Sequence, residues 1–168
     1  LYGVKVLLEA GMVCDLVALE KEHFRLSKLG LLVLQDAMTR ANMDFTADVC
    51  YRGIAHLREA VRTGKPAGLK ELGPWSTIYE GLAHLPPHVQ HSWFAFDHYY
   101  SDDLFPAALP VVFANQPRRL LDVGANTGKF SLTCLQHDAD VHVTLLDLPG
   151  QLDMARAKLD ASGHGTRA

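Results

Sequence analysis

The sequence has few cysteines, and they do not form a recognisable pattern. Among its 168 residues are three cysteines, Cys14, Cys50 and Cys134, which lie far apart and show no C-x-x-C spacing. This pattern argues against a disulfide framework and against a thiolate zinc site. We expect all three to be ordinary buried thiols in a reducing environment, which indicates a cytoplasmic protein.

The sequence also lacks a large excess of either charge and a long apolar run. Its net charge is only −3, whereas a domain that neutralises nucleic-acid phosphates is usually strongly basic. No apolar run approaches the roughly 20 residues that cross a bilayer, and no basic-then-apolar leader is present. We therefore expect neither nucleic acid nor membrane as a partner. Apolar residues make up 48% of the chain, which is enough to build a sizeable core.

Both ends of the sequence are typical of positions inside a longer protein. It starts at Leu1 within the helical pattern LYGVKVLLEAG, and it stops at GHGTRA just after another helical pattern. An alternating series of strands and helices would be expected to continue there. We therefore expect the chain to be the N-terminal two-thirds or less of its protein, incomplete at both ends.

Residues 1–115 are almost entirely helical in pattern, with one short hairpin near the start. Apolar residues recur at helical spacing up to Gly11, a natural C-cap. The runs VCDLVALE and HFRLS flank a charged turn and predict a hairpin, and Ser27 caps a helix to about Asp36. Helix, hairpin and helix in this order are typical of a winged helix.

Longer helical patterns follow the hairpin. Apolar residues from Phe45 to Val61 predict one face of a helix that ends at Gly64. A short helix is expected to begin at Thr77, and Pro86-Pro87 precede the helical pattern HVQHSWFAFDHYY.

The pattern changes at Gln116, where strands begin to alternate with helices. RRLLDVG predicts a strand, TGKFSLTCLQHD a helix, VHVTLLDLPG a second strand and QLDMARAKLDAS a second helix. This order predicts a parallel sheet with right-handed crossovers. The fold class is therefore mixed: a mostly α-helical, winged-helix-like domain over residues 1–115, followed over residues 116–168 by the start of a Rossmann-like α/β domain.

The turn in LLDVGANTGKFS lacks residues that two kinds of nucleotide site require. A dinucleotide fold has G-x-G-x-x-G, but the second and third glycines are replaced here by Asn126 and Lys129. A phosphate-binding P-loop has four residues between its first glycine and its Gly-Lys, whereas only three separate Gly124 from Gly128. In addition, Phe130 stands where the magnesium-binding Ser or Thr belongs. Both interpretations are therefore disfavoured by particular residues.

The pattern that remains is Asp122, Gly124, Asn126 and Gly128, an acid followed by alternate small or polar positions. It resembles the first motif of the class I S-adenosylmethionine-dependent methyltransferases. That cofactor carries no phosphate, so it needs no phosphate cradle. Gly124 would let the backbone approach the ligand, and Asp122 could accept from the cofactor's ammonium group, directly or through water.

Asp147 supports this interpretation, because it closes the second strand 19 positions after Gly128. An acid at this place conventionally binds both ribose hydroxyls. The segment LLDLPGQL around it resembles the DLP motif of O-methyltransferases of the plant phenolic and bacterial hydroxyindole type. The departure from that family lies at Ala125-Asn126, where glycines are more usual.

The resemblance implies an S-adenosylmethionine-dependent O-methyltransferase with an N-terminal winged-helix dimerisation domain. It implies a homodimer and a small-molecule hydroxyl as acceptor, with a catalytic histidine well downstream of the second strand and so beyond Ala168. It also implies that the helix SWFAFDHYYSD lines the cavity for cofactor or substrate through Phe96, Asp97 and Tyr100. The residues expected to bind the cofactor are Asp122, Gly124, Ala125, Asn126, Gly128, Asp147 and Leu148.

Other interpretations remain open. A winged-helix regulator that uses a methyltransferase-like domain only to bind a ligand is the alternative function. His88 and His91 are spaced to share a metal ion, but no third ligand is evident, so no metal site is predicted. Lys129 lies in the first turn of a helix, where a lysine is usually solvated. The acceptor substrate cannot be read from these residues.

Overall fold

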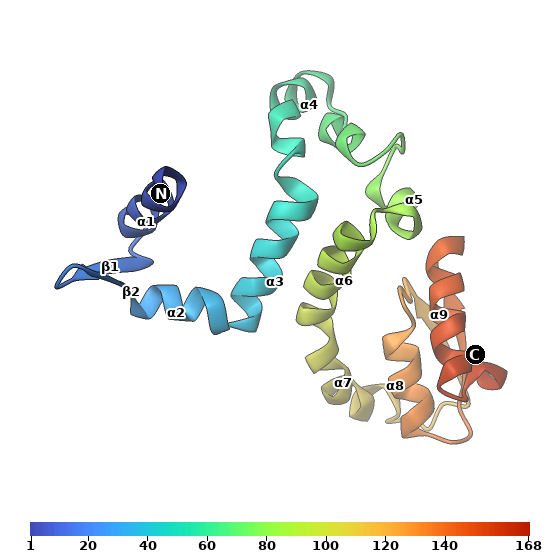
Figure 1. Cartoon of the computed structure of the whole chain (residues 1–168). Coiled ribbons are helices and arrows are strands. Elements are labelled where there is room, and N and C mark those ends of the chain that lie inside the picture. The colour runs from blue at the N-terminus through green and yellow to red at the C-terminus, as the bar shows by residue number, and fades with distance from the viewer.

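The computed structural model describes residues 1–168. An extended, mostly helical part leads into a small α/β unit (Figure 1). None of its helices combines the length and the apolar character that crossing a bilayer requires. The strands are β1 (Val17–Glu20), β2 (His23–Leu26), β3 (Arg119–Val123) and β4 (His142–Leu146). The α-helices are α1 (Tyr2–Val13), α2 (Lys28–Gln35), α3 (Ala37–Phe45), α4 (Leu57–Thr63), α5 (Ile78–Gly81), α6 (Pro87–Ser101), α7 (Phe105–Val112), α8 (Lys129–His137) and α9 (Pro149–Ala161).

Residues 1–35, called the arm below, form a helix, a hairpin and a helix that project away from the rest of the chain (Figure 1). Strands β1 and β2 pair antiparallel, and the turn residues Lys21 and Glu22 have φ of 47° and 66°, as a two-residue hairpin loop with both central residues left-handed requires. The Ser27 hydroxyl accepts from the Gly30 backbone N–H at 3.0 Å and caps α2. The predicted order of elements is confirmed, while a winged-helix packing of them stays a prediction.

The predicted end of α1 at Gly11 is wrong, because the helix continues to Val13. The chain leaves the helical direction at Asp15, which has a φ of 55°. Gly11 instead lies where α1 meets β1, and a Cβ there would be 3.0 Å from Cγ2 of Val17. Its small size therefore permits the contact between helix and strand.

The three cysteines are free, but they are not all buried. Cys134 is buried between α8 and the sheet, and Cys50 is partly covered. Cys14 is exposed, because the arm that carries it has almost no interior. The expectation of three buried thiols is thus wrong for Cys14.

The single helix expected between Phe45 and Gly64 is broken into several pieces. Helix α3 ends at Phe45, a π-helical turn follows, and α4 begins only at Leu57. Between them the backbone of Gly53 approaches Gly68 so closely that a Cβ on Gly68 would lie 2.6 Å from the Gly53 carbonyl oxygen. This contact between two backbones folds the chain back on itself, which the apolar spacing could not predict. The C-cap at Gly64, with a φ of 66°, agrees with the sequence.

Helix α6 runs beside α3 and carries the chain toward the α/β unit (Figure 1). It begins at Pro87, in agreement with the Pro86-Pro87 signal. Phe45 of α3 packs on Trp93 of α6 with ring centroids 5.6 Å apart. The buried Ser92 donates to Asp48 at 2.6 Å. Apolar and polar contacts together fix the direction in which α6 points.

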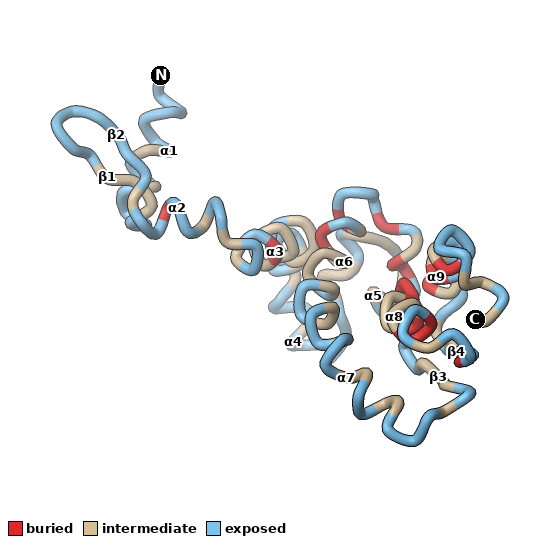
Figure 2. Tube along the Cα trace, turned by 90° about the horizontal axis from the view of Figure 1, so that it is seen from below, coloured by how far each residue is buried: buried red, intermediate tan, exposed pale blue.

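Strands β3 and β4 pair in parallel, as the order of strands and helices predicts, with Asp122 opposite Leu145. Helices α8 and α9 pack against one face of this sheet, and Figure 2 shows the buried residues gathered there and along α6. The other face carries apolar side chains in the open: Leu121 is 61% exposed and Val123 is 68% exposed. The core consists of Cys134, Leu135, Val141, Val143 and Leu159.

Candidate functional site

The turn between β3 and α8 has an unusual backbone. Gly124, Asn126 and Gly128 have φ of 75°, 51° and 72°, a region that glycine enters freely and asparagine tolerates. The Gly124 N–H donates to the Leu146 carbonyl at 2.8 Å, which ties the turn to the neighbouring strand. The turn therefore lies at the carboxyl ends of both strands, where parallel α/β sheets bind their ligands.

Asp147, just beyond the end of β4, is bound to the same turn. Its Oδ2 accepts from the backbone N–H of Asn126 at 2.7 Å, and its Oδ1 accepts from the N–H of Leu148 at 2.7 Å. A carboxylate offers about four acceptor positions, so each oxygen retains capacity for one further donor. The acid is thus held in a fixed orientation and can still accept two hydroxyl groups.

A cavity of about 260 Å³ opens beside the turn, between it and α6. Two carboxylates, Asp97 and Asp122, line it. Asp122 accepts from the Ser131 hydroxyl at 2.6 Å, while Asp97 accepts from the side-chain amide nitrogen of Asn126. The amide oxygen of Asn126 is buried and has no hydrogen-bond partner in the protein. Since buried polar atoms are normally paired, this oxygen suits a ligand that brings a donor. The cavity is lined by Asp97, His98, Ser101, Phe105, Asp122, Gly124, Ala125, Asn126, Lys129 and Phe130.

No protein-family model and no curated protein sequence matches the chain. Solved structures match it over almost its whole length. PigF with SAH has a TM-score of 0.71 and 17% identity, covering 99% of this chain and 50% of PigF. The O-methyltransferase NcsB1, in complex with S-adenosylmethionine and 2-hydroxy-5-methyl naphthoic acid, has a TM-score of 0.67 and 23% identity, covering 99% and 52%. The mitomycin 7-O-methyltransferase MmcR has a TM-score of 0.66 and 19% identity, covering 99% and 50%.

The chain is similar in fold to about half of each of these structures. It spans about half the length of the solved structures that it matches. The predicted fold class, a helical N-terminal part followed by the first part of a Rossmann-like domain, is consistent with this similarity.

The structure places the sequence-predicted residues at several different positions around the turn and on α6. Asp97, Asp122, Gly124, Ala125 and Asn126 line the cavity. Gly128 is buried in the turn itself, and Asp147 binds the turn through the Asn126 N–H but does not line the cavity. Leu148 is 43% exposed beyond the end of β4. One turn thus joins the two acids that the sequence placed on separate strands.

Phe96 and Tyr100 lie elsewhere, at the contact between α6 and α3. The ring of Phe96 stacks on Phe45 with centroids 4.2 Å apart, and the Tyr100 hydroxyl accepts from the amide nitrogen of Asn42 at 2.8 Å. Residues four apart share one face of a helix, so Phe96 and Tyr100 face α3. Asp97, the residue after Phe96, lies on the face of α6 that points toward the turn. Of the three residues predicted to line the cavity, Phe96 and Tyr100 therefore pack on α3, and only Asp97 lines the cavity.

A polar cluster that the sequence analysis missed links α6 to the turn. Lys129 forms an ion pair with Asp102, so the expectation of a solvated lysine is wrong. His98 lies between them and the turn, with Nδ1 3.2 Å from Oδ1 of Asp102 and Nε2 3.1 Å from Oγ1 of Thr127. The spacing of His98 and Asp102, four residues apart on a helix, was the one signal in the sequence that could have revealed this pair.

The charges of this cluster shift the proton affinities of its members. Burial, together with the charge of Lys129, lowers the pKa of His98, although the Asp102 carboxylate opposes the shift. Burial alone would raise the pKa of Asp102, but the hydrogen bond from Lys129 and the charge of Lys129 lower it overall. Burial and the Lys129 charge also lower the pKa of Lys158. The arrangement therefore favours a neutral imidazole beside a charged ion pair.

The structure brings no three His, Cys, Asp or Glu side chains together in a way that could hold a metal ion. His88 and His91 lie in the first turns of α6, and both are exposed.

Proposed function

We propose that this chain is the cofactor-binding part of an S-adenosylmethionine-dependent methyltransferase that methylates a hydroxyl group of a small molecule. The observation that carries the proposal is the contact between the Asn126 backbone N–H and the Asp147 carboxylate, 2.7 Å apart. It joins the glycine turn after one strand to the acid after the next strand. An acid at this place can bind ribose hydroxyls, and the turn lacks the residues of a phosphate-binding loop.

The cavity beside the turn suits the amino-acid end of this cofactor. S-adenosylmethionine carries an ammonium and a sulfonium, and the Asp97 and Asp122 carboxylates place negative charge on the cavity wall. The unpartnered Asn126 oxygen could accept from the ammonium. Gly124 leaves room for close approach, since a Cβ there would meet nothing within 4 Å. When bound, the cofactor supplies an electrophilic methyl group.

For residues of this chain we propose binding and orientation and assign no acid–base role. Holding donor and acceptor in line supplies much of the rate of a group transfer. The choice of a hydroxyl acceptor is supported by the fold neighbours, among which MmcR is named a 7-O-methyltransferase and NcsB1 is described with a hydroxynaphthoic acid.

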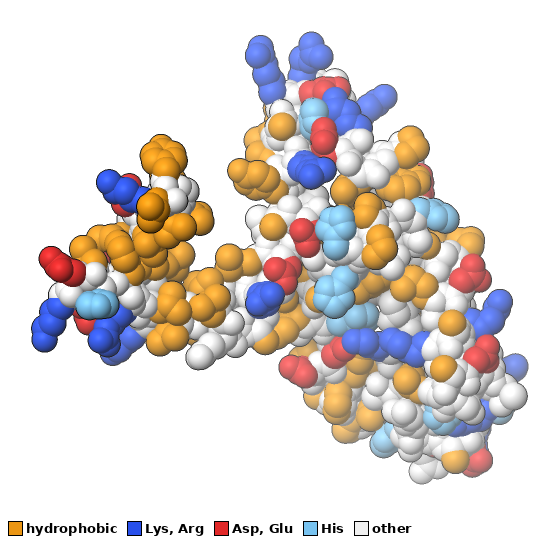
Figure 3. All heavy atoms as spheres, viewed as in Figure 1, with side chains coloured by type: hydrophobic (Ala, Val, Ile, Leu, Met, Phe, Trp, Pro, Cys, Tyr) orange, Lys and Arg blue, Asp and Glu red, His pale blue; other side chains and the backbone are white.

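We further propose that residues 1–35 dimerise with a second copy of the chain. Among these residues only Gly30 is buried, while Leu7 is 74% exposed and Leu32 is 54% exposed. Figure 3 shows hydrophobic side chains over much of this arm, with charged side chains gathered at its outer end. An open apolar surface of this kind is typical of a protein interface, and a symmetric pair of identical arms would bury it on both copies.

Calorimetric titration of the full-length protein with S-adenosylhomocysteine tests the cofactor proposal. We expect binding, and we expect Asp147→Asn to weaken it at least about tenfold, because the amide can accept at only one of the two positions. Asp140→Asn is the matched control, since Asp140 is exposed and pairs only with Arg118 at the opposite end of β4. A folded protein that binds no S-adenosylhomocysteine, or one in which the two variants behave alike, would contradict the proposal.

A further inference from the structure

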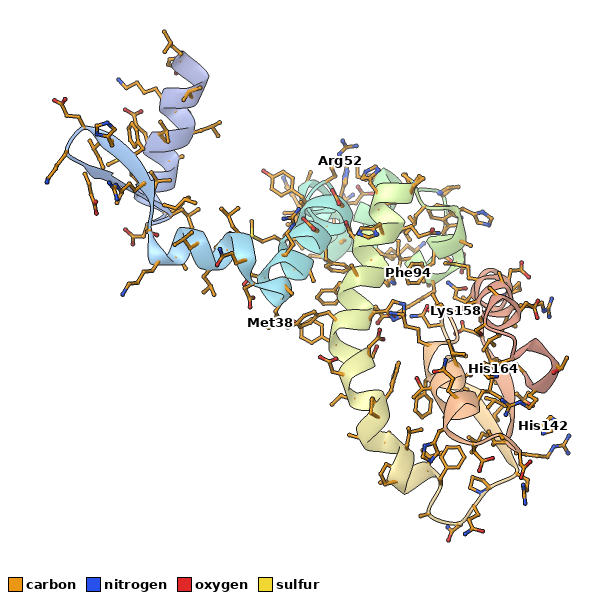
Figure 4. The ribbon with its side chains drawn as sticks, turned by 60° about the horizontal axis from the view of Figure 1, so that its bottom comes forward. Met38, Arg52, Phe94, His142, Lys158 and His164 are labelled. Atoms are coloured by element: carbon orange, nitrogen blue, oxygen red, sulfur yellow. The ribbon has the colours of Figure 1, made fainter.

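His98 occupies the junction between the cofactor cavity and a second, more open cavity of about 460 Å³. It stacks on Phe94, one turn earlier on α6, with ring centroids 6.0 Å apart. Figure 4 labels Phe94 on α6 and Lys158 on α9. The second cavity is lined by Pro87, Gln90, His91, Phe94, Ala95, His98 and Lys129.

The hydrogen bonds around His98 favour one neutral proton arrangement. The Lys158 ammonium, which can only donate, reaches Oγ1 of Thr127 at 3.3 Å. The Thr127 hydroxyl can donate its own proton to Nε2 of His98, 3.1 Å away, only when Nε2 is unprotonated. Nδ1–H then donates to Asp102. In this neutral tautomer the Thr127 hydroxyl both accepts and donates.

We propose that neutral His98 is a positioning residue, which holds Thr127 and thereby keeps the glycine turn in the conformation that binds the cofactor. Thr127 lies between Asn126, whose N–H binds Asp147, and Gly128, and it is 6% exposed. Because His98 on α6 holds the Thr127 side chain, the backbone of Asn126 and Gly128 on either side is also held in place. The proposal rests on the cofactor site proposed above.

Protonation of His98 would disturb this arrangement. With Nε2 protonated, Oγ1 of Thr127 would accept from both His98 and Lys158, and the Thr127 hydroxyl proton would lose its acceptor. The new charge would also join two cations, Lys129 from α8 and Lys158 from α9, which Asp102 and Asp97 offset only in part. The other titratable group at the second cavity is His91 on α6. We therefore infer that acid weakens cofactor binding through His98.

Calorimetric titration of the full-length protein with S-adenosylhomocysteine at pH 7.5 and pH 5.5 tests the proposal. For the unaltered protein we expect the affinity to fall about five- to tenfold at the lower pH, the equivalent of one lost hydrogen bond. His98→Ala should bind about five- to tenfold more weakly at both pH values. His98→Gln, which offers an uncharged acceptor and donor, should lose less affinity than His98→Ala and should show no pH dependence. His91→Gln should follow the unaltered protein.

Amide hydrogen exchange at pH 7.5 without ligand provides a second readout. His98→Ala should increase exchange at Asn126 and Gly128, while α9 keeps its protection. Equal affinities of His98→Ala and the unaltered protein, or an undiminished pH dependence in His98→Gln, would overturn the positioning role alone. If the unaltered protein bound no S-adenosylhomocysteine at either pH, the cofactor proposal would fail first and this inference would fall with it.

Discussion

Gly128 and Ala155 are in direct contact, and this contact joins the glycine turn to helix α9. A Cβ on Gly128 would lie 3.0 Å from the Cβ of Ala155, and the φ of Gly128 is 72°. Ala155 is itself fully buried, so it has no free space into which it could move. Both the conformation of the turn and its packing therefore require glycine at this position.

We expect Gly128→Ala to lower the free energy of unfolding by about 2–4 kcal/mol, from backbone strain of about 1–2 kcal/mol plus crowding against Ala155. Gly124→Ala is the matched control. Its φ of 75° brings the same strain, but a Cβ there would meet nothing within 4 Å, so we expect a loss of only about 1–2 kcal/mol. Urea denaturation measures both values, and equal losses would show that Ala155 does not resist the added methyl group.

The guanidinium of Arg167 ties the end of the described chain to the core of the α/β unit. It donates to the carbonyl oxygens of Leu135 at 2.8 Å, Asp138 at 2.9 Å and Val141 at 3.1 Å. We expect Arg167→Ala to cost about 1–3 kcal/mol of unfolding free energy, because partly buried carbonyls lose charged donors. Arg167→Lys should recover only part of the loss, since an ammonium cannot reproduce the planar fork. Thermal unfolding of both variants checks this order, and Arg156→Ala on exposed α9 surface should change little.

The lowered pKa of His98 predicts a pH dependence of stability that is separate from cofactor binding. Its ordinary value is 6.5, and burial lowers it in the folded protein. Below about pH 6.5 the unfolded chain therefore binds a proton that the folded protein does not yet accept, so stability falls as the pH falls through this window. We expect urea unfolding between pH 7.5 and 5.5 to show a smaller decline for His98→Gln than for the unaltered protein. An equal decline would mean that the titration of other groups accounts for it.

The proposed dimer can be tested by placing a charge on the exposed apolar surface of the arm. Leu32→Glu, on α2, should convert a dimer of the full-length protein largely to monomer, because the carboxylate would be desolvated at the interface. Lys28→Glu changes an exposed charge on the same helix and is the control. Sedimentation equilibrium measures the mass, and circular dichroism checks that the helices remain. A monomeric unaltered protein would contradict the dimer.

The sequence predicted the local elements well where each depended on its own residues. The cap at Ser27, the start of α6 at Pro87 and the parallel pairing after Gln116 all agree with the structure. It failed where distant segments meet. The helix expected through Gly53 is broken by the backbone of Gly68, and nothing in the spacing of apolar residues records that contact.

The same division holds for the candidate site. The acid and the glycine turn were visible in the spacing of Asp122, Gly124 and Gly128, because a tight turn limits which residues it accepts. The left-handed conformation of Asn126 was not predicted. The direction of the residues on α6 was not visible. An aromatic helix face can pack on a neighbouring helix or on a ligand, and here Phe96 packs on Phe45.

The sequence by itself determined the glycine turn and the acids that flank it, since these are local matters of φ, spacing and charge. Only the tertiary structure decided that Asp97 lines the cavity, that Lys129 pairs with Asp102, and that His98 contacts the turn through Thr127. Those contacts join α6 and its C-terminal end to a turn about 29 residues further along the chain. They arise because Phe45 and Trp93 fix the direction of α6, and no local pattern around His98 contains that information.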